Sequence, residues 1–433
     1  MAVSSEREPL LPYSKRPRPS FFVGSRPLCQ YEPVAPPLIY NPSPPRPFWS
    51  FSLSFRAKVI LVMVVLPAYL LATSALSALG PLNTHDTVIR TPQTEPMPEP
   101  SSGEGQPKAP QDPFASIKGP LMDTNFPDPA IIHADGVSYS FATNNRGAGA
   151  DMVHVQVATS TDNQTWTLLD HYDALPKVAT WETGARVWAP DVVQLDDGSF
   201  VLYYSGELAS SPAFHCVGAA TSKDVMGPYV PLERPIACPD VFTRGGAIDP
   251  DGYHDPSTGK RYVVYKTDGN SIGHGGSCNN DVAPIVSTPI MLQEVGQDGI
   301  SIIGDAIQIL DRDDIDGPLI EAPSLHRSEE GIYFLFFSSN CFTTPKYDVS
   351  YATAPSIKGP YTKSSRPLLV TSDANLVGPG GLDIIKGGNM VVFHGHITTD
   401  NDPSHDEKTT NAPLVRGMWS GIATFNGTNV CFN

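Results

Sequence analysis

From about residue 119 onward, apolar residues occur in short runs rather than at helical spacing. Each run is rich in aromatic and β-branched residues and begins at a turn that contains glycine, as in DGVSYSFAT, DGSFVLYYSG, TGKRYVVYKTDG, EGIYFLFFSSN and GGNMVVFHGH. Such runs, bounded by turn residues, are typical of β-strands. The pattern therefore predicts an all-β domain over residues 119–433.

The runs recur at a regular interval. Their turn glycines are separated by 62, 61, 72 and 57 residues, and they are Gly136, Gly198, Gly259, Gly331 and Gly388. A second marker, an Ala-Thr pair, begins at Ala158, Ala220 and Ala352, at about the same interval or twice that interval. A repeat of roughly 60 residues has room for four strands, as in one blade of a propeller. We therefore expect a five-bladed β-propeller.

The chain before residue 119 has a different pattern. Residues 1–58 are rich in Pro and Arg, with 8 Lys and Arg against 3 Asp and Glu, and they predict a disordered cytosolic tail. Val59–Gly80 is uncharged and 22 residues long, which is enough for a transmembrane signal-anchor helix. Residues 81–118 are rich in Pro, Ser and Glu and predict a stalk. The predicted domains are thus 1–58, 59–80, 81–118 and 119–433.

Charge predicts the orientation of this anchor. Arg56 and Lys58 precede the apolar stretch, whereas PLNTHD directly after it contains neither Lys nor Arg. The positive-inside rule then gives a single-pass type II membrane protein with a lumenal or extracellular propeller. A cleaved signal peptide is the alternative, but 58 residues precede the stretch. Another alternative is a secreted enzyme to which an incorrect gene model has joined an unrelated leader.

The tail carries one candidate sorting signal. Glu6 and the pair Leu10-Leu11 resemble an acidic dileucine motif read by adaptor proteins, which would favour an endomembrane, vacuolar or cell-surface location. An incidental leucine pair in a disordered tail is the alternative.

Charge and cysteine content restrict the partners and the compartment. The formal charge of −16 excludes nucleic acid as a partner, because phosphate binding needs clustered cations. NQT at Asn163 and NGT at Asn426 are candidate glycosylation sites. At most two disulfides can form among the five cysteines after the apolar stretch, and the pairing stays open among Cys216, Cys238, Cys278, Cys341 and Cys431.

Four carboxylates hold similar positions in four repeats. Asp128, Asp191, Asp249 and Glu321 lie eight, seven, ten and ten residues before the turn glycine of their own repeat. The innermost strands of a propeller surround one axis, so we expect these side chains to meet at one level of an axial site. Crowded carboxylates raise the pKa of one another, and a metal, a cationic ligand or acid–base chemistry would justify that cost. A single Asp-Pro turn is more often structural, but four in phase favour a site.

Inverting glycoside hydrolysis needs such a pair. One carboxylic acid protonates the leaving oxygen, and one carboxylate about 6.5–9.5 Å away activates a water. A third carboxylate can hold the acid in its protonated form.

The motifs NFPDPAII, VWAPDVVQLDDG, GGAIDPDGY and EAPSL resemble, in this order, glycoside hydrolase family 43. The resemblance implies a five-bladed propeller that cleaves arabinosyl or xylosyl linkages with inversion, here in a membrane-anchored member of fungal type. It implies Asp128 as general base, Glu321 as general acid and Asp249 as modulator of the acid's pKa. Trp188 and Asp191 would shape the sugar subsite.

The last blade departs from the family pattern. In GPGG, Gly381 stands where the family has His, and some arabinan-cleaving members use a His near the axis to hold calcium or a water cluster. His394 or His396 is a candidate to replace it in binding substrate or a structural calcium ion, although either could be a packed strand residue. Arg416 resembles a family Arg that reaches the active site, with a strand-pairing role as the alternative. No cofactor is otherwise required.

The predicted substrate is an oligosaccharide or polysaccharide that contains arabinose or xylose. An α-L-arabinofuranosidase acting on 1,5-arabinan is the leading prediction, and a β-xylosidase of the same family is the near alternative. A retaining fructan-cleaving propeller would carry Asn-Asp-Pro-Asn-Gly, which FPDPAI lacks. A non-catalytic, membrane-tethered carbohydrate-binding propeller would be expected to lack one of the three catalytic carboxylates.

Overall fold

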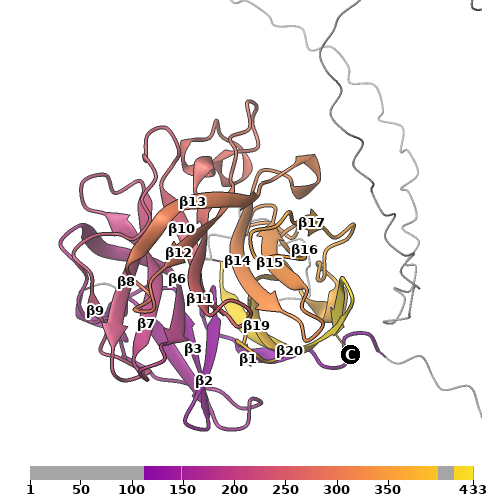
Figure 1. The fold of residues 1–433 in the computed structure, drawn as a ribbon, viewed down its shortest axis with the longest axis horizontal. Helices are drawn as coiled ribbons and strands as arrows, with labels where there is room; N and C mark the ends of the chain where they lie inside the picture. The colour runs from indigo at the N-terminus through magenta and orange to yellow at the C-terminus, as the bar shows by residue number, and fades with distance from the viewer. Residues whose placement is uncertain (1–111, 148, 398–413, 433) are drawn as a thin grey trace, which may run out of the picture. The chain divides into compact units, whose positions relative to one another are not determined.

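The computed structural model describes residues 112–147, 149–397 and 414–432. The predicted tail with Leu10 and Leu11, the predicted span at 59–80 and the predicted stalk as far as residue 111 lie outside the described residues. The described part forms five antiparallel sheets arranged as a β-propeller, which confirms the predicted all-β architecture (Figure 1).

No helix in the described ranges is long and apolar enough to cross a membrane.

Four blades each take four consecutive strands. Blade 1 contains β2 (Ala130–Ala134), β3 (Val137–Ala142), β4 (Gln156–Ser160) and β5 (Thr167–Leu168). Blade 2 contains β6 (Glu182–Gln194), β7 (Phe200–Leu208), β8 (His215–Ser222) and β9 (Val230–Pro231). Blade 3 contains β10 (Ala247–Asp255), β11 (Lys260–Thr267), β12 (Ile290–Val295) and β13 (Ile302–Leu310). Blade 4 contains β14 (Ile320–Arg327), β15 (Tyr333–Ser339), β16 (Asp348–Ala354) and β17 (Thr362–Lys363).

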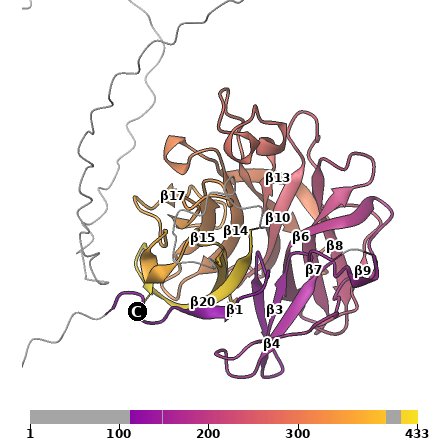
Figure 2. The same ribbon diagram turned by 180° about the vertical axis from the view of Figure 1, so that it is seen from behind.

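Blade 5 combines strands from both ends of the propeller. It contains β18 (Gly380–Ile384), β19 (Met390–His396), β20 (Arg416–Asn426) and β1 (Lys118–Met122), with β21 (Asn429–Phe432) also paired to β20. Lys118 lies opposite Ser420, and Met122 lies opposite Met418. The two strands lie side by side in Figure 2. The first strands of the five blades contact one another in a closed ring, β2–β6–β10–β14–β18, and this ring surrounds the axis.

The predicted turn glycines join the first two strands of each blade. Gly136, Gly198, Gly259 and Gly331 all have a positive φ. In blade 5 the left-handed residue is Gly387, with φ 73°, one residue before the predicted Gly388. The Gly388 N–H donates to the Ile385 carbonyl at 3.0 Å.

The continuous apolar runs reflect strands that are buried on both faces. Successive side chains of a strand point to opposite sides. In β15, Phe334 and Phe336 therefore pack against Phe393 of blade 5, whereas Leu335 and Phe337 pack in the core shared with blade 3. Burial of apolar surface between blades is the main stabilising contribution in such a fold.

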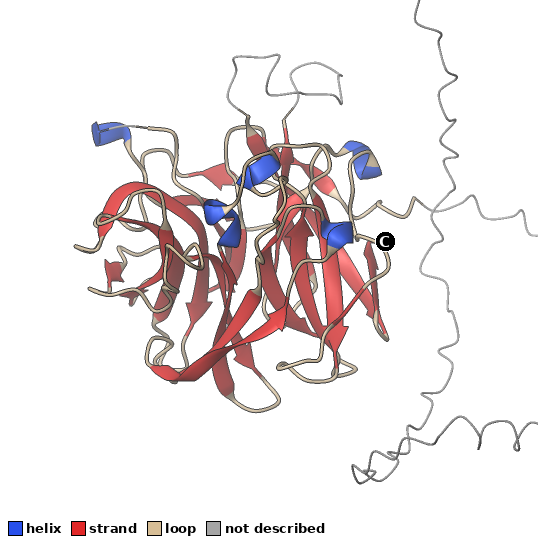
Figure 3. Ribbon diagram, turned by 90° about the horizontal axis from the view of Figure 1, so that it is seen from above, coloured by secondary structure: helices blue, strands red, loops and turns tan. Residues whose placement is uncertain are grey.

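Short 3₁₀ turns lie in the connections on one side of the sheets (Figure 3). They are η1 (Gly149–Asp151), η2 (Gly269–Ile272), η3 (Ser277–Asn279), η4 (Asp314–Asp316) and η5 (Asp373–Asn375). η4 and η5 directly precede first strands, and η1 and η2 directly follow second strands. This side of the propeller is therefore the end where the predicted carboxylates enter the axis.

Two disulfides join four of the predicted cysteines: Cys216–Cys238 and Cys278–Cys341. The second bridges 63 residues and links the β11–β12 connection of blade 3 to the connection after β15 in blade 4. Both sequon asparagines, Asn163 and Asn426, have exposed side chains.

Candidate active site

One tripeptide from each blade lines a pocket on the axis. The five tripeptides are 128–130, 189–191, 249–251, 322–324 and 381–383. The first residue of each has a φ between 42° and 58°, and in four blades Pro follows it. We call this residue the left-handed position. Left-handed backbone next to proline turns the chain sharply into the first strand.

The four predicted carboxylates do not share one position in this turn. Asp128 and Asp249 both occupy the left-handed position, in blades 1 and 3. Glu321 lies one residue before it, whereas Asp191 lies two residues after it. The strand register shifts across the turn in blades 2 to 5, and Asp191 is the first paired residue after the shift in its blade, as Asp251 and Asp383 are in theirs. The expectation of a single level is therefore wrong for Asp191, which belongs to a second layer of the axis.

The backbone N–H of each left-handed residue is capped by a side chain of the preceding blade. The donors and acceptors are Asp128 to His394 Nδ1 (3.1 Å), Ala189 to Thr143 Oγ1 (2.9 Å), Asp249 to Ser205 Oγ (2.9 Å), Ala322 to Asp249 Oδ2 (3.0 Å) and Gly381 to Ser338 Oγ (2.9 Å). Four of these acceptors lie on or just after the second strand of their blade. Blade 3 is the exception, because Asp249 itself caps the N–H of Ala322.

Both carboxylate oxygens of Asp128 are held by charged or polar groups. Arg416 Nη1 donates to Oδ1 at 2.7 Å, and Thr143 Oγ1 donates to Oδ2 at 2.6 Å. The Arg416 guanidinium also lies 4.8 Å from the centre of the Phe342 ring. These contacts favour the ionised carboxylate. The structure therefore brings Arg416 to the base that the sequence predicted.

Glu321 is held through both oxygens by a different pair of donors. Lys266 Nζ lies 2.9 Å from Oε2, and the Tyr347 hydroxyl donates to Oε1 at 2.9 Å. Lys266 is fully buried, and its ammonium also lies 3.1 Å from Asp268 Oδ1. Glu321 is thus placed beside a cation and a phenol, in surroundings unlike those of Asp128.

No cation among the described residues lies in hydrogen-bond contact with Asp249. Its burial, and then the charge of Glu321, raise its pKa to about 8. The protonated form of Asp249 therefore predominates at neutral pH. Since Oδ2 accepts from the Ala322 N–H, Oδ1 is the oxygen left to carry the proton.

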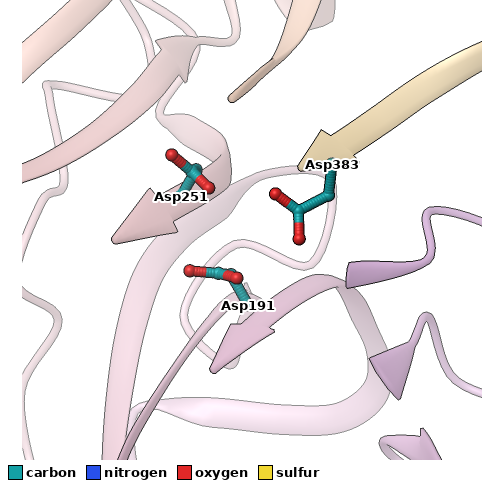
Figure 4. Close-up of side chains that lie close together, drawn as sticks. All are labelled: Asp191, Asp251 and Asp383. Carbon is teal, nitrogen blue, oxygen red and sulfur yellow. The ribbon is translucent and has the colours of Figure 1, made fainter. Parts of the chain in front are cut away.

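The second layer of the axis contains three aspartates, one each from β6, β10 and β18. Figure 4 shows the side chains of Asp191, Asp251 and Asp383 pointing toward one another, and their oxygens lie within 4.8 Å. Each also accepts a backbone N–H from the next blade around the ring: Gly252 to Asp191 (2.8 Å), Leu325 to Asp251 (3.0 Å) and Ile131 to Asp383 (2.8 Å). The layer therefore ties the first strands of neighbouring blades together.

Lys386 supplies the positive charge in this layer. Its ammonium contacts Asp251 Oδ1 and lies 3.2 Å from Asp383 Oδ1. Burial raises the pKa of Asp191 to about 6 against the opposing charge of Lys386. A divalent ion would have to displace this ammonium, so the three aspartates do not fit the predicted calcium.

His394 does not fit a calcium site either. Its Nδ1 accepts from the Asp128 N–H, so Nε2 carries the hydrogen and offers no lone pair. Burial and the nearby Arg416 lower the pKa of His394 well below its usual value, which keeps the ring neutral. His394 thus supports Asp128, while His396 Nε2 lies 2.8 Å from the Phe342 carbonyl.

Trp188 is half-buried beside the left-handed position of blade 2. Its ring stacks on His215 with centroids 3.7 Å apart. Burial lowers the pKa of His215 to about 3, so this ring is neutral too. The pair lies next to the turns of blades 2 and 3, because Trp188 directly precedes Ala189 and His215 is bridged to Gly246.

Sequence reasoning missed several residues of the two layers: Thr143, Lys266, Tyr347, Asp251, Asp383 and Lys386. A signal existed for Asp251 and Asp383, because they follow the left-handed position at the same offset as Asp191 in APD, DPD and GLD. Lys266 is the one charged residue within the run YVVYKT. Nothing in the sequence marks Tyr347, which reaches Glu321 from the connection after β15.

Comparisons with known proteins agree with this architecture. The family model for glycosyl hydrolases family 43 matches residues 117–414. The chain is 24% identical over 319 residues to extracellular endo-α-(1→5)-L-arabinanase 2 of Bacillus subtilis, covering 66% of this chain and 63% of that protein. It is 25% identical to the extracellular endo-α-(1→5)-L-arabinanase of Thermotoga petrophila, over 54% of this chain and 50% of that one. The chain thus spans half to two thirds of the length of these relatives.

Solved structures show the same fold. The crystal structure of a thermostable family-43 glycoside hydrolase covers 72% of this chain and 93% of its own, with a TM-score of 0.56 and 23% identity.

Proposed function

Because the chain belongs to glycosyl hydrolase family 43, we propose that it is an inverting glycoside hydrolase. Its active site is the layer of the propeller axis that contains Asp128, Asp249 and Glu321. Asp128 acts as general base, Glu321 as general acid, and Asp249 as the neighbour that adjusts the protonation of Glu321. Trp188 binds the sugar, and Arg416 holds the Asp128 carboxylate in place.

The single observation that supports these roles best is the contrast between the two carboxyl environments. Asp128 is paired with a guanidinium and a hydroxyl, which suits a base that must be ionised. Glu321 is also bonded to a cation and a hydroxyl, Lys266 and Tyr347, but it differs from Asp128 in its strong charge coupling to the buried Asp249, whose pKa the charge of Glu321 raises. Pairs of titratable groups in different environments are the usual basis for dividing acid and base roles.

The proposed reaction is a single displacement. The Asp128 carboxylate takes a proton from water as the water oxygen forms a bond to the anomeric carbon. The bond from that carbon to the glycosidic oxygen breaks, and the Glu321 carboxyl gives its proton to the departing oxygen. The product sugar is released with inverted configuration.

For the substrate we propose arabinan, cleaved at α-1,5 linkages. The support is the names of the two relatives described above, both endo-α-(1→5)-L-arabinanases, together with the aromatic pair of Trp188 and His215 beside the acids. A xylosidic substrate is the alternative outcome.

We also propose that the propeller lies outside the cytosol, anchored by residues 59–80. Two disulfides and two exposed sequons are consistent with an oxidising compartment. The anchor and the adaptor signal at Leu10-Leu11 stay predictions, because both lie outside the described residues.

Hydrolysis of aryl α-L-arabinofuranoside, aryl β-D-xyloside and 1,5-arabinan by the full-length chain tests the proposal. We expect activity on the arabinosyl substrates, inversion by proton NMR of the first product, and loss of activity in Glu321→Gln on native arabinan. Net retention would contradict the mechanism. A preference for xyloside would show that the substrate is xylosidic and not arabinan. Binding of glycan without hydrolysis would show that the propeller binds carbohydrate without catalysis.

A further inference from the structure

Blade 3 breaks the capping pattern of the other four blades at one residue. Thr143, Ser205, Ser338 and His394 each use an uncharged acceptor to cap the N–H of the next left-handed residue. In blade 3 the second strand instead ends with Lys266 and Thr267. A lysine ammonium has no acceptor atom, so it cannot cap Ala322, and Asp249 does so.

The fold alone does not require this lysine. Burial of an ammonium is costly unless it is fully paired, whereas a small hydroxyl does the same structural work in blades 1, 2 and 4. Lys266 is 0% exposed, and its ammonium lies 2.9 Å from Glu321 Oε2 and 3.1 Å from Asp268 Oδ1. The residue that departs from the pattern is thus the one that touches the proposed acid.

We propose that Lys266 is a positioning residue for the general acid: it fixes the Glu321 carboxyl at the axis and sets the pH range over which Glu321 can give up a proton. The proposal rests on the role proposed above for Glu321. Lys266 would therefore influence the reaction through the Glu321 side chain and would not contact the sugar.

The charged groups around Glu321 come from four elements. Lys266 and Asp268 lie on or just after β11, Asp249 lies on β10, Tyr347 lies before β16, and Asp128 lies before β2. Lys266 is the one cation that the described residues place in contact with Glu321. An adjacent cation favours the carboxylate, and the three neighbouring aspartates and the buried phenol oppose it when charged. Lys266 is therefore the neighbour that favours the charged form of Glu321.

Two variants of the full-length chain separate position from charge. Lys266→Met keeps the length of the side chain without its charge, and Lys266→Arg keeps the charge. In Lys266→Met we expect the alkaline limb of the pH profile of kcat/KM to move up by about one pH unit. We expect kcat to fall about 10- to 100-fold with a smaller change in KM, because misplacement of a catalytic group lowers kcat. Lys266→Arg should keep the wild-type limb and recover part of kcat.

A matched control is Lys260→Met, which removes a lysine from the same strand, where it forms an exposed pair with Glu294. We expect it to leave activity and the alkaline limb nearly unchanged. An unmoved limb in Lys266→Met, or an equal shift in Lys260→Met, would overturn the proposal and leave Lys266 a structural residue.

A measurement that does not depend on activity completes the test. The carboxyl ¹³C signal of Glu321, assigned by its loss in Glu321→Gln, is followed against pH in wild type and Lys266→Met. We expect titration at higher pH in the variant, and identical curves would overturn the proposal. If no glycoside were hydrolysed, the proposed function would fail, and this titration would still decide whether Lys266 controls Glu321.

Discussion

Asp128 and Asp249 show how one residue type in one backbone position acquires two chemical states. Both stand before a proline with φ 56°, in blades that the repeat makes equivalent. Their difference lies entirely in their neighbours. Arg416 and Thr143 hold Asp128, whereas Asp249 has burial and the Glu321 charge around it.

The first prediction concerns the base. Asp128→Asn keeps the shape of the side chain but cannot take a proton from water, so we expect kcat to fall at least about 10³-fold, somewhat beyond the usual lower range for a lost general base. The stability of the variant should fall, since Arg416 loses its charged partner although the amide can still bond Thr143. Azide added as an external nucleophile should restore turnover, and a variant with more than a tenth of wild-type kcat would contradict the role.

The second prediction concerns Asp249 and stability. Its pKa is raised from 3.8 to about 8, so the protonated form stabilises the fold below about pH 4, and this stabilisation is lost as the pH rises toward 8. Asp249→Asn imitates the protonated form at every pH. We therefore expect the Tm of this variant to fall less than that of wild type between pH 5 and pH 8 in thermal melts.

Parallel Tm curves for wild type and Asp249→Asn would show that Asp249 is ionised in the folded chain. The same variant should also move one limb of the pH–rate profile rather than abolish turnover, in contrast to Asp128→Asn.

At the scale of single residues, the sequence pointed to Asp128, Asp249 and Glu321. Each belongs to an Asp-Pro or Glu-Ala-Pro motif that stands at a similar position in its repeat. The sequence could not predict Lys266, Tyr347 or Thr143. These side chains meet the acids only after neighbouring blades pack, and their local sequence resembles that of any buried strand end. The second-layer position of Asp191 becomes predictable only when residues are counted from the left-handed residue, Ala189, which the sequence alone does not identify.

The element that builds the site is the sharp turn at the start of each first strand. Gly381 occupies it in blade 5, with φ 58°, and a Cβ added there would lie 2.8 Å from Cε1 and Nδ1 of His394. Since His394 caps the Asp128 N–H, the turn of one blade is coupled to the base of the next.

The third prediction follows from this contact. Gly381→Ala should destabilise the chain by more than about 1 kcal/mol, because alanine disfavours a positive φ and the added methyl displaces His394. We expect kcat to fall with it through movement of Asp128. Gly387→Ala is the control, since that glycine also has a positive φ but open space around it. An equal loss of kcat in both variants would mean that backbone strain alone is responsible.

For the whole molecule, the sequence predicted the number of blades because the turn glycines and aromatic strands repeat. It did not indicate which strand completes the last blade. β1 carries no glycine turn or aromatic run of its own, and its pairing with β20 is set by closure of the ring.

The axis also determines whether the whole molecule depends on a metal. Lys386 balances the three aspartates of the second layer, so the fourth prediction is that EDTA leaves the Tm of the wild-type chain unchanged within about 1 °C, a small part of the several-degree shift expected for about 1 kcal/mol. Lys386→Met should destabilise the chain by about 1–3 kcal/mol, less than for a fully buried ion pair because the lysine is partly exposed.

Lys260→Met, at an exposed pair with Glu294, is the control for the loss of a lysine and should leave stability nearly unchanged. A fall of several degrees in the wild type on chelation, reversed by calcium, would show that an ion and not Lys386 neutralises the axis.

The closing strand has a mechanical consequence. β1 is the outer strand of blade 5, and all of the chain before residue 112 is joined covalently to it. A pull applied through that segment reaches the bonds of Ser116 to Ile422 first and then the pairing of β1 with β20, where Lys118 lies opposite Ser420 and Met122 lies opposite Met418. Tension would separate β1 from β20 and open blade 5. This blade supplies His394 and Arg416 to Asp128. The strand that joins the propeller to the preceding chain therefore also completes the blade that holds the proposed base.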